Sequence, residues 1–119
     1  MEQHEKGVAL SDTQWNNVQT YMLNDRNPTF RQLCTAFGRY EAHRGRKEAT
    51  DTLRRCLEDP DGYVVASTLA HLVKWLKVPD GAQLLARFEQ DPRAPVRDVV
   101  ENLRTNPPES ESFQMQGTL

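Results

Sequence analysis

Long apolar runs, glycine-rich loops and cysteine pairs are all missing from this 119-residue sequence. No stretch approaches the roughly 20 apolar residues that a membrane-spanning helix needs, and the first residues form no apolar leader. We therefore expect a cytoplasmic protein. The six glycines are scattered and form neither GxGxxG nor GxxxxGK, which argues against a phosphate-binding loop. Cys34 and Cys56 form no CxxC motif, so we expect two buried thiols and not a disulfide or a metal pair.

Catalytic and metal-binding motifs are equally scarce. The sequence contains no GxSxG, and its one His-Glu pair is His4-Glu5, near the start of the chain. His43 and His71 have no carboxylate at the spacing of a ligand pair, and a helix histidine of this kind is usually packed. We predict that the protein is not an enzyme and holds no metal or cofactor. A lyase-like or metal enzyme is the least favoured alternative.

An excess of basic residues is also absent, because the net charge is −2. There is no overall attraction to nucleic acid or to an anionic membrane. The charge is uneven, however. Residues 39–55 contain six basic and three acidic residues, and the rest of the chain contains nine basic and fourteen acidic ones. This basic patch is interpreted as a solvated face, as a docking surface for an acidic partner or, third, as a nucleic-acid contact.

Apolar residues recur at helical spacing along the chain, and no segment shows the two-residue alternation of a strand. We predict six helices. Ser11 with Gln14 is a capping-box pattern for a helix from Asp12, and Thr29 with Gln32 suggests the next start. The predicted apolar stripes, in order, are Trp15, Val18 and Met22; Phe30, Leu33, Phe37 and Tyr40; Ala49, Leu53, Cys56 and Leu57; Val65, Leu69, Leu72 and Leu76; Leu84, Leu85 and Phe88; and Val96, Val99, Val100 and Leu103.

A pattern of 32 residues recurs. Asp59-Pro60 is followed at that distance by Asp91-Pro92 and preceded by Asn27-Pro28. Because proline cannot continue a helix, each pair ends one helix and prepares the next. A helix pair cannot hide its own apolar side, and about three stacked pairs are the minimum that does so. The central helix, over 62–77, should therefore be apolar around most of its surface.

The recurring unit resembles HEAT repeats, and in particular the short HEAT-like repeat of the phycobilisome-lyase type. The match is best over 53–103, where Asp91 is followed by Val96, Arg97 and Leu103. The resemblance implies an all-α, short α-solenoid of about three stacked antiparallel helix pairs. Val65 stands where Arg97 would recur, so an Asp–Arg ladder between repeats is incomplete.

The predicted organisation is a helical repeat domain over 11–104, between a flexible tail at 1–10 and a disordered tail at 105–119. Our leading interpretation is a protein–protein interaction module that uses the surface of its second helices. It would be an adaptor or an inhibitor, such as an immunity protein that binds a toxin. Nucleic-acid binding through residues 39–55 is the alternative. The residues predicted to bind a partner with an acidic or mixed surface are Lys47, Arg54, Arg55, Gln83 and Arg87, and Trp75 is either a core residue or a partner anchor.

Overall fold

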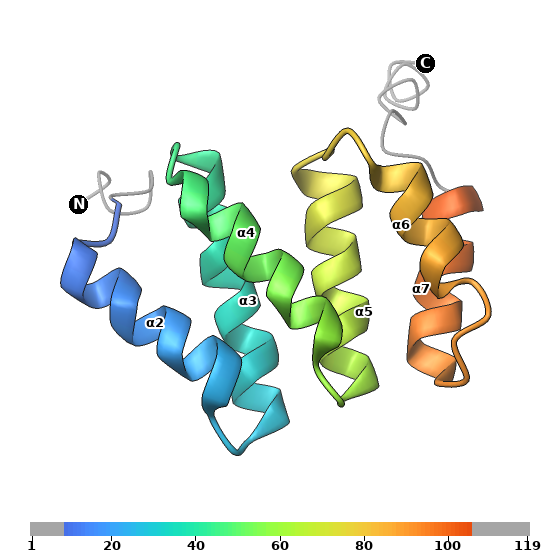
Figure 1. The fold of residues 1–119 in the computed structure, drawn as a ribbon, viewed down its shortest axis with the longest axis horizontal. Helices are drawn as coiled ribbons and strands as arrows, with labels where there is room; N and C mark the ends of the chain where they lie inside the picture. Colours follow the sequence, from blue (N-terminus) through green and yellow to red (C-terminus); the bar gives the residue numbers. More distant parts are fainter. Residues whose placement is uncertain (1–8, 106–119) are drawn as a thin grey trace, which may run out of the picture.

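The computed structural model describes residues 9–105, and within them the chain is all-α, as predicted. Six α-helices are joined by short turns (Figure 1). A 3₁₀ turn, η1 (Cys56–Glu58), follows the third helix, and a π-helical segment, η2 (His71–Trp75), extends the fourth. The predicted tails lie almost entirely outside the described residues. The helices are α2 (Asp12–Asn24), α3 (Pro28–His43), α4 (Lys47–Arg55), α5 (Gly62–Ala70), α6 (Gly81–Phe88) and α7 (Ala94–Thr105).

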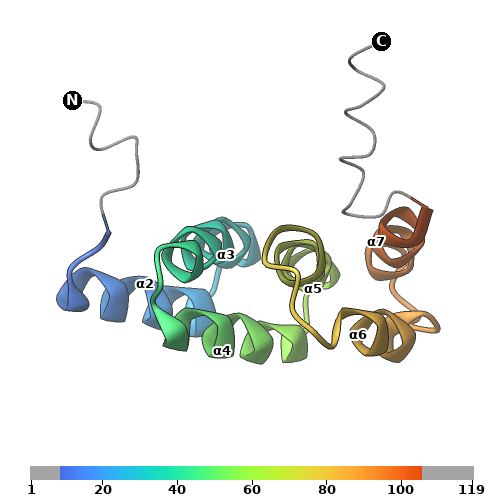
Figure 2. The ribbon, with the colours of Figure 1, turned by 90° about the horizontal axis from the view of Figure 1, so that it is seen from above.

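The helices are arranged in two layers (Figure 2). One layer, which we call the first-helix layer, holds α2, α4 and α6. The other, the second-helix layer, holds α3, α5 and α7. The chain alternates between the layers, so that α3 contacts both α2 and α4, and also lies against α5 in its own layer. On its other side, α5 contacts α7.

Side-chain caps explain where three of the helices begin. The Ser11 hydroxyl accepts from the Gln14 backbone N–H at 3.1 Å, and the Gln14 side chain accepts from the Ser11 N–H at 2.9 Å, which confirms the capping box. Asn27 and Asp61 accept from the first backbone N–H groups of α3 and α5 in the same way. The cap of α3 is therefore Asn27 and not the predicted Thr29.

The core lies between the two layers and contains most of the apolar residues predicted for α4 to α7. Both cysteines are buried and free of disulfides, as expected. Burial raises the pKa of the Cys56 thiol to about 12, because the thiolate would be poorly solvated there. The buried apolar residues are Trp15, Met22, Cys34, Ala49, Leu53, Cys56, Leu57, Val64, Val65, Leu69, Leu72, Val73, Leu84, Leu85, Phe88, Val96, Val100 and Leu103.

The central helix differs from the continuous helix predicted over 62–77. Regular α-helical geometry ends at Ala70, and the five residues of η2 follow with π-helical hydrogen bonding. A wider turn shifts the following side chains around the helix axis. Leu72 is still fully buried, but Trp75 is 48% exposed and lies at the surface. Lys77, with a φ of 51°, then ends the helical path.

The second helix of the chain, α3, buries a different side from the one predicted. Gly38 faces inward and allows α2 and α4 to approach, because a Cβ at this position would lie 3.1 Å from side-chain atoms of both Met22 and Leu53. The prediction that the apolar stripe of this helix packs in the core is wrong. The buried residues of α3 are Cys34, Thr35, Gly38 and Glu41, whereas Phe30, Leu33, Phe37 and Tyr40 are exposed.

The turns that precede the second helices explain this difference. In each turn an aspartate side chain accepts the backbone N–H of the residue two positions later, at 2.9 to 3.0 Å. These aspartates are Asp25, Asp59 and Asp91. They are separated by 34 and then 32 residues, so the first unit is shifted by two positions from the 32-residue alignment. Two positions correspond to about 200° around a helix, which moves a core position to the opposite side.

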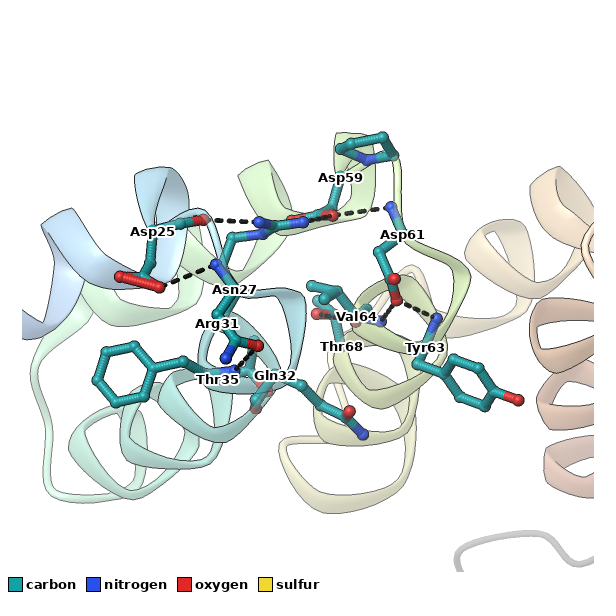
Figure 3. A network of polar contacts seen from close by, with 12 residues as sticks. Asp25, Asn27, Arg31, Gln32, Thr35, Asp59, Asp61, Tyr63, Val64 and Thr68 are labelled. Atoms are coloured by element: carbon teal, nitrogen blue, oxygen red, sulfur yellow. Dashed lines mark hydrogen bonds and ion pairs between the residues drawn. The ribbon is translucent and has the colours of Figure 1, made fainter.

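Arg31 connects the first two of these turns (Figure 3). Its Nε and Nη2 donate to the two carboxylate oxygens of Asp59 at 2.8 and 2.9 Å, and its Nη1 donates to the carbonyl oxygen of Asp25 at 2.6 Å. Arg93 reaches the middle turn from the other side and donates to the carbonyl oxygens of Asp59 and Pro60. The three turns are thereby joined in a row along one edge of the protein.

A buried carboxylate holds the opposite end of α3. Glu41 is 1% exposed, and its oxygens accept from Arg46 Nε at 2.9 Å, Arg44 Nη1 at 3.0 Å and the Leu10 backbone N–H at 3.0 Å. Burial raises the pKa of Glu41, but these donors outweigh that effect and leave the pKa below its usual value. Arg46 also donates to the Leu10 carbonyl oxygen and to Asp12, so the start of α2 is fastened to the turn after α3.

We predict that Glu41→Gln lowers the free energy of unfolding by about 2–4 kcal/mol, because two arginines lose their common carboxylate in a buried site. Glu48→Gln is the matched control. This carboxylate is exposed and lies 3.6 Å from Arg46, so its removal should change stability by less than about 0.5 kcal/mol. Urea denaturation of both variants at pH 7.5 checks the prediction. Equal stability of the two variants would contradict the role given to Glu41.

Candidate functional site

The outward stripe of α3 holds four of the seven large hydrophobic side chains that are exposed among the described residues. Its spacing of three, four and three residues places all four side chains on one side of the helix. Leu33 is 54% exposed, Phe37 43% and Tyr40 47%. At its start, the Phe30 ring meets Tyr21 of α2 edge to face, with 5.5 Å between ring centroids. We call this surface, together with Trp75 at its other end, the aromatic face; it comprises Tyr21, Phe30, Leu33, Phe37, Tyr40 and Trp75.

Arg39 joins the end of the α3 stripe to η2. Its guanidinium carbon lies 4.8 Å from the ring centre of Tyr40 and 4.7 Å from that of Trp75. These distances are within the range of cation–π attraction. The Nε of Arg39 is buried without a hydrogen-bond partner, and within residues 9–105 no carboxylate forms an ion pair with this arginine. Arg39 is thus held by two aromatic rings, and its Nη groups have no acceptor among the described residues.

A row of polar side chains lies beside this cluster, between α3 and α5. Gln32 donates to the Ser67 hydroxyl at 2.7 Å. Thr35 donates its hydroxyl hydrogen to the Gln32 carbonyl oxygen at 2.6 Å, so at 3.1 Å it accepts from Nε2 of His71. This assigns the proton of the neutral imidazole to Nε2 and leaves Nδ1 buried without a partner. Burial, assisted by the positive charge of Arg39, lowers the pKa of His71 to about 4.

The charges of this surface are of one sign. Along α3 the sequence has a single acidic residue, the buried Glu41, and along α5 and η2 it has none. The basic residues include Arg39 on α3 and Lys74 on η2, whose Nζ lies 5.2 Å from the centre of the Trp75 ring. An apolar surface with a cationic end and no exposed carboxylate favours a ligand that is apolar and negatively charged.

The residues predicted to bind a partner lie elsewhere. Two of them are engaged in ion pairs: Arg54 with Asp80 at 2.7 Å, and Arg87 with Glu58 at 2.6 Å. All five belong to the first-helix layer, although the prediction placed the binding surface on the second helices. Lys47, Arg54 and Arg55 are on α4, and Gln83 and Arg87 are on α6. Only the sixth residue, the predicted anchor Trp75, belongs to the aromatic face.

Sequence reasoning missed the α3 stripe as a surface because it treated the most apolar side of the helix as the buried one. A second side of α3 has the same helical spacing and carries the small residues Cys34, Thr35 and Gly38. The aspartates that begin the three turns carry the signal for the correct register, since their side chains can form Asx turns. Aligning Asp25 with Asp59 would have placed Phe37 outside the core.

Comparison with models of protein families, with curated proteins and with solved structures found no match for this chain. Between residues 9 and 105, no three His, Cys, Asp or Glu side chains converge in a way that could hold a metal ion. None of the helices in the same region has the length and apolar character needed to cross a bilayer.

The low pKa of His71 predicts acid sensitivity. A base whose pKa falls from 6.5 to about 4 on folding binds protons more readily in the unfolded chain, so stability is lost as the pH falls from 6.5 towards 4. His71→Gln retains a donor for Thr35 but does not titrate. Between pH 7.5 and 4.5 the wild type should lose about 2–3 kcal/mol more than this variant, measured by urea denaturation.

The matched control for this prediction is His43→Gln, at the exposed end of α3, which should lose stability in parallel with the wild type. Identical acid profiles for the wild type and His71→Gln would show that His71 is not held neutral by its surroundings.

Proposed function

We propose that this chain is a protein–protein interaction module whose binding surface is the aromatic face, most of which belongs to the second-helix layer. We further propose that its architecture is a short α-solenoid of three antiparallel helix pairs, α2–α3, α4–α5 and α6–α7, as the resemblance to HEAT-like repeats implies. The recurring aspartate turns, joined in a row by Arg31 and Arg93, support this arrangement. In such stacks each pair contacts its neighbours and the layer surfaces remain open to partners.

The single observation that carries the proposal is the exposure of the α3 stripe. Four large side chains in consecutive helical turns are placed outward, whereas most large apolar side chains of the other helices are buried in the core. A contiguous apolar surface of this kind on a soluble protein usually marks a place where another macromolecule binds. Helical geometry makes the surface rigid, because α3 is fastened at both ends by Arg31 and by Glu41. A partner would therefore meet a preformed site.

The composition of the aromatic face fits a protein partner. Tryptophan, tyrosine and arginine are the residues that contribute most often to the affinity of protein interfaces. Here one of each is gathered, since Arg39 lies against both Tyr40 and Trp75. Trp75 is the proposed anchor, and Leu33 and Phe37 supply apolar surface along α3.

A rigid module of this size suits an adaptor, or an inhibitor that covers the working surface of another protein, and an immunity protein is one form of such an inhibitor. The nucleic-acid alternative has weaker support. In the 39–55 patch Arg44 and Arg46 donate to Glu41, and Arg54 donates to Asp80, which leaves few cations for phosphate groups.

The test compares two surfaces of the full chain. The immobilised wild type and variants are used to capture proteins from an extract of the source organism, with quantitative mass spectrometry as the readout. Leu33→Asp with Phe37→Asp should reduce capture of the specific partner at least about tenfold, because each substitution places a charge where the partner would cover an apolar side chain. Both positions are exposed, so circular dichroism should show an unchanged fold.

The matched control reverses two charges in the first-helix layer, by Arg55→Glu with Arg87→Glu, and should retain the partner. Retention by the α3 variant would contradict the proposed surface. If only the variant at Arg55 and Arg87 fails to capture the partner, the binding site would instead be the five residues predicted from the sequence.

A further inference from the structure

We propose that Arg39 is a carboxylate receptor, and that the aromatic face binds an acidic amphipathic helix of another protein. This inference rests on the proposed function and specifies the chemistry of its partner. The bound helix would place apolar side chains along Leu33 and Phe37, and a glutamate or aspartate against the guanidinium of Arg39.

The first argument is the unusual state of Arg39. Most arginines of the described region donate to a carboxylate or a backbone carbonyl, as Arg31 and Arg54 do. Arg39 instead lies between the rings of Tyr40 and Trp75, with its Nε buried and unpaired. The two Nη groups are not among the buried unpaired atoms, and within residues 9–105 they have no acceptor, so a carboxylate from a partner would pair with them while the stacked rings hold the guanidinium in place.

The second argument is charge complementarity. The outer surfaces of α3, α5 and η2 expose no carboxylate, since Glu41 is buried under Arg44 and Arg46. Lys74, close to Trp75, adds a second cation beside Arg39. A cationic partner would be repelled here, whereas an acidic one would be attracted and oriented with its charges toward this end of α3.

The third argument is shape. The stripe from Phe30 to Tyr40 covers eleven residues, or about 15 Å of helix. That is the length of three turns, which an amphipathic helix matches with side chains at positions i, i+3 and i+7. A single strand of nucleic acid also uses aromatic and basic residues, but it would leave the aliphatic Leu33 without a stacking partner. The observations therefore favour a helix.

The experiment is a selection from a displayed library of 18-residue helical peptides. Their apolar positions are kept as Leu, Phe or Met, and the positions beside the apolar stripe are randomised among Glu, Gln and Lys. Selection on the full-length wild type should enrich Glu over both Gln and Lys beside the apolar stripe. The best peptide is then labelled, and its Kd is measured by fluorescence anisotropy on the wild type and on variants.

Arg39→Gln should weaken binding of the Glu peptide at least about tenfold, and Arg39→Lys should weaken it less, because lysine keeps the charge but not the planar fork. The matched peptide with Gln in place of that Glu should bind the wild type as weakly as the Glu peptide binds Arg39→Gln. The affinity of this Gln peptide should be the same for the wild type and for Arg39→Gln. Circular dichroism establishes that both variants remain folded.

Several results would overturn the inference. Selected peptides without a preference for Glu, or with binding unchanged by Arg39→Gln, would remove the carboxylate receptor and leave the proposed function standing. If no selected peptide distinguishes the wild type from Leu33→Asp with Phe37→Asp, the proposed function itself fails at this surface.

Three other occupants are also tested with the full chain. Tighter peptide binding by Glu109→Gln with Glu111→Gln would show that residues 106–119 of this chain occupy Arg39. A dimer in sedimentation that Leu33→Asp dissolves would assign the surface to a second copy. Binding of a fluorescent oligothymidylate that Arg39→Gln abolishes would assign it to nucleic acid. Each of these results contradicts the helix proposal.

Discussion

The rotation of α3 about its own axis is the constraint on which the rest of this structure depends. Two charged contacts determine it, one at each end of the helix. Arg31 pairs with Asp59 in the turn before α5, and Glu41 pairs with Arg46 in the turn after α3. Both side chains point into the protein, so the residues between them on the same side, including Gly38, must also face inward. The large apolar side chains of α3 must then lie on its outer side, where they form most of the aromatic face.

Such an arrangement exchanges hydrophobic burial for specificity of orientation. An apolar stripe of four residues would contribute several kcal/mol if it were buried, at roughly 1.5–3 kcal/mol for each large side chain. Natural sequences break a local rule of this kind mostly at functional positions. The charged contacts at the two ends of α3 keep the stripe exposed even though burial would be favourable. This is the physical reason for proposing that the stripe is a binding surface and not an unfinished core.

The basic patch illustrates how the same residue type can serve two purposes. Arg44 and Arg46 satisfy the buried Glu41 and are structural, and Arg54 is paired with Asp80 between α4 and α6. Arg39 belongs to the same segment but lies on α3, against the rings of Tyr40 and Trp75 in the second-helix layer. Counting charges along 39–55 could not separate these roles, because the sign of a side chain says nothing about which acceptor lies within reach after folding.

Much of the fold was accessible from the sequence, because it follows from local chemistry. Apolar residues at helical spacing predict a buried stripe on each of three helices, which contain Leu53, Leu69 and Leu85. All three of these residues are buried. The capping box at Ser11 and the recurring Asp-Pro turns place helix ends correctly, since caps and turns involve neighbours in the chain. What only the tertiary structure decided is which side of α3 is buried and what surrounds Arg39. Those outcomes depend on contacts between residues about 30 positions apart, such as Arg31 with Asp59, whose energies no local pattern contains.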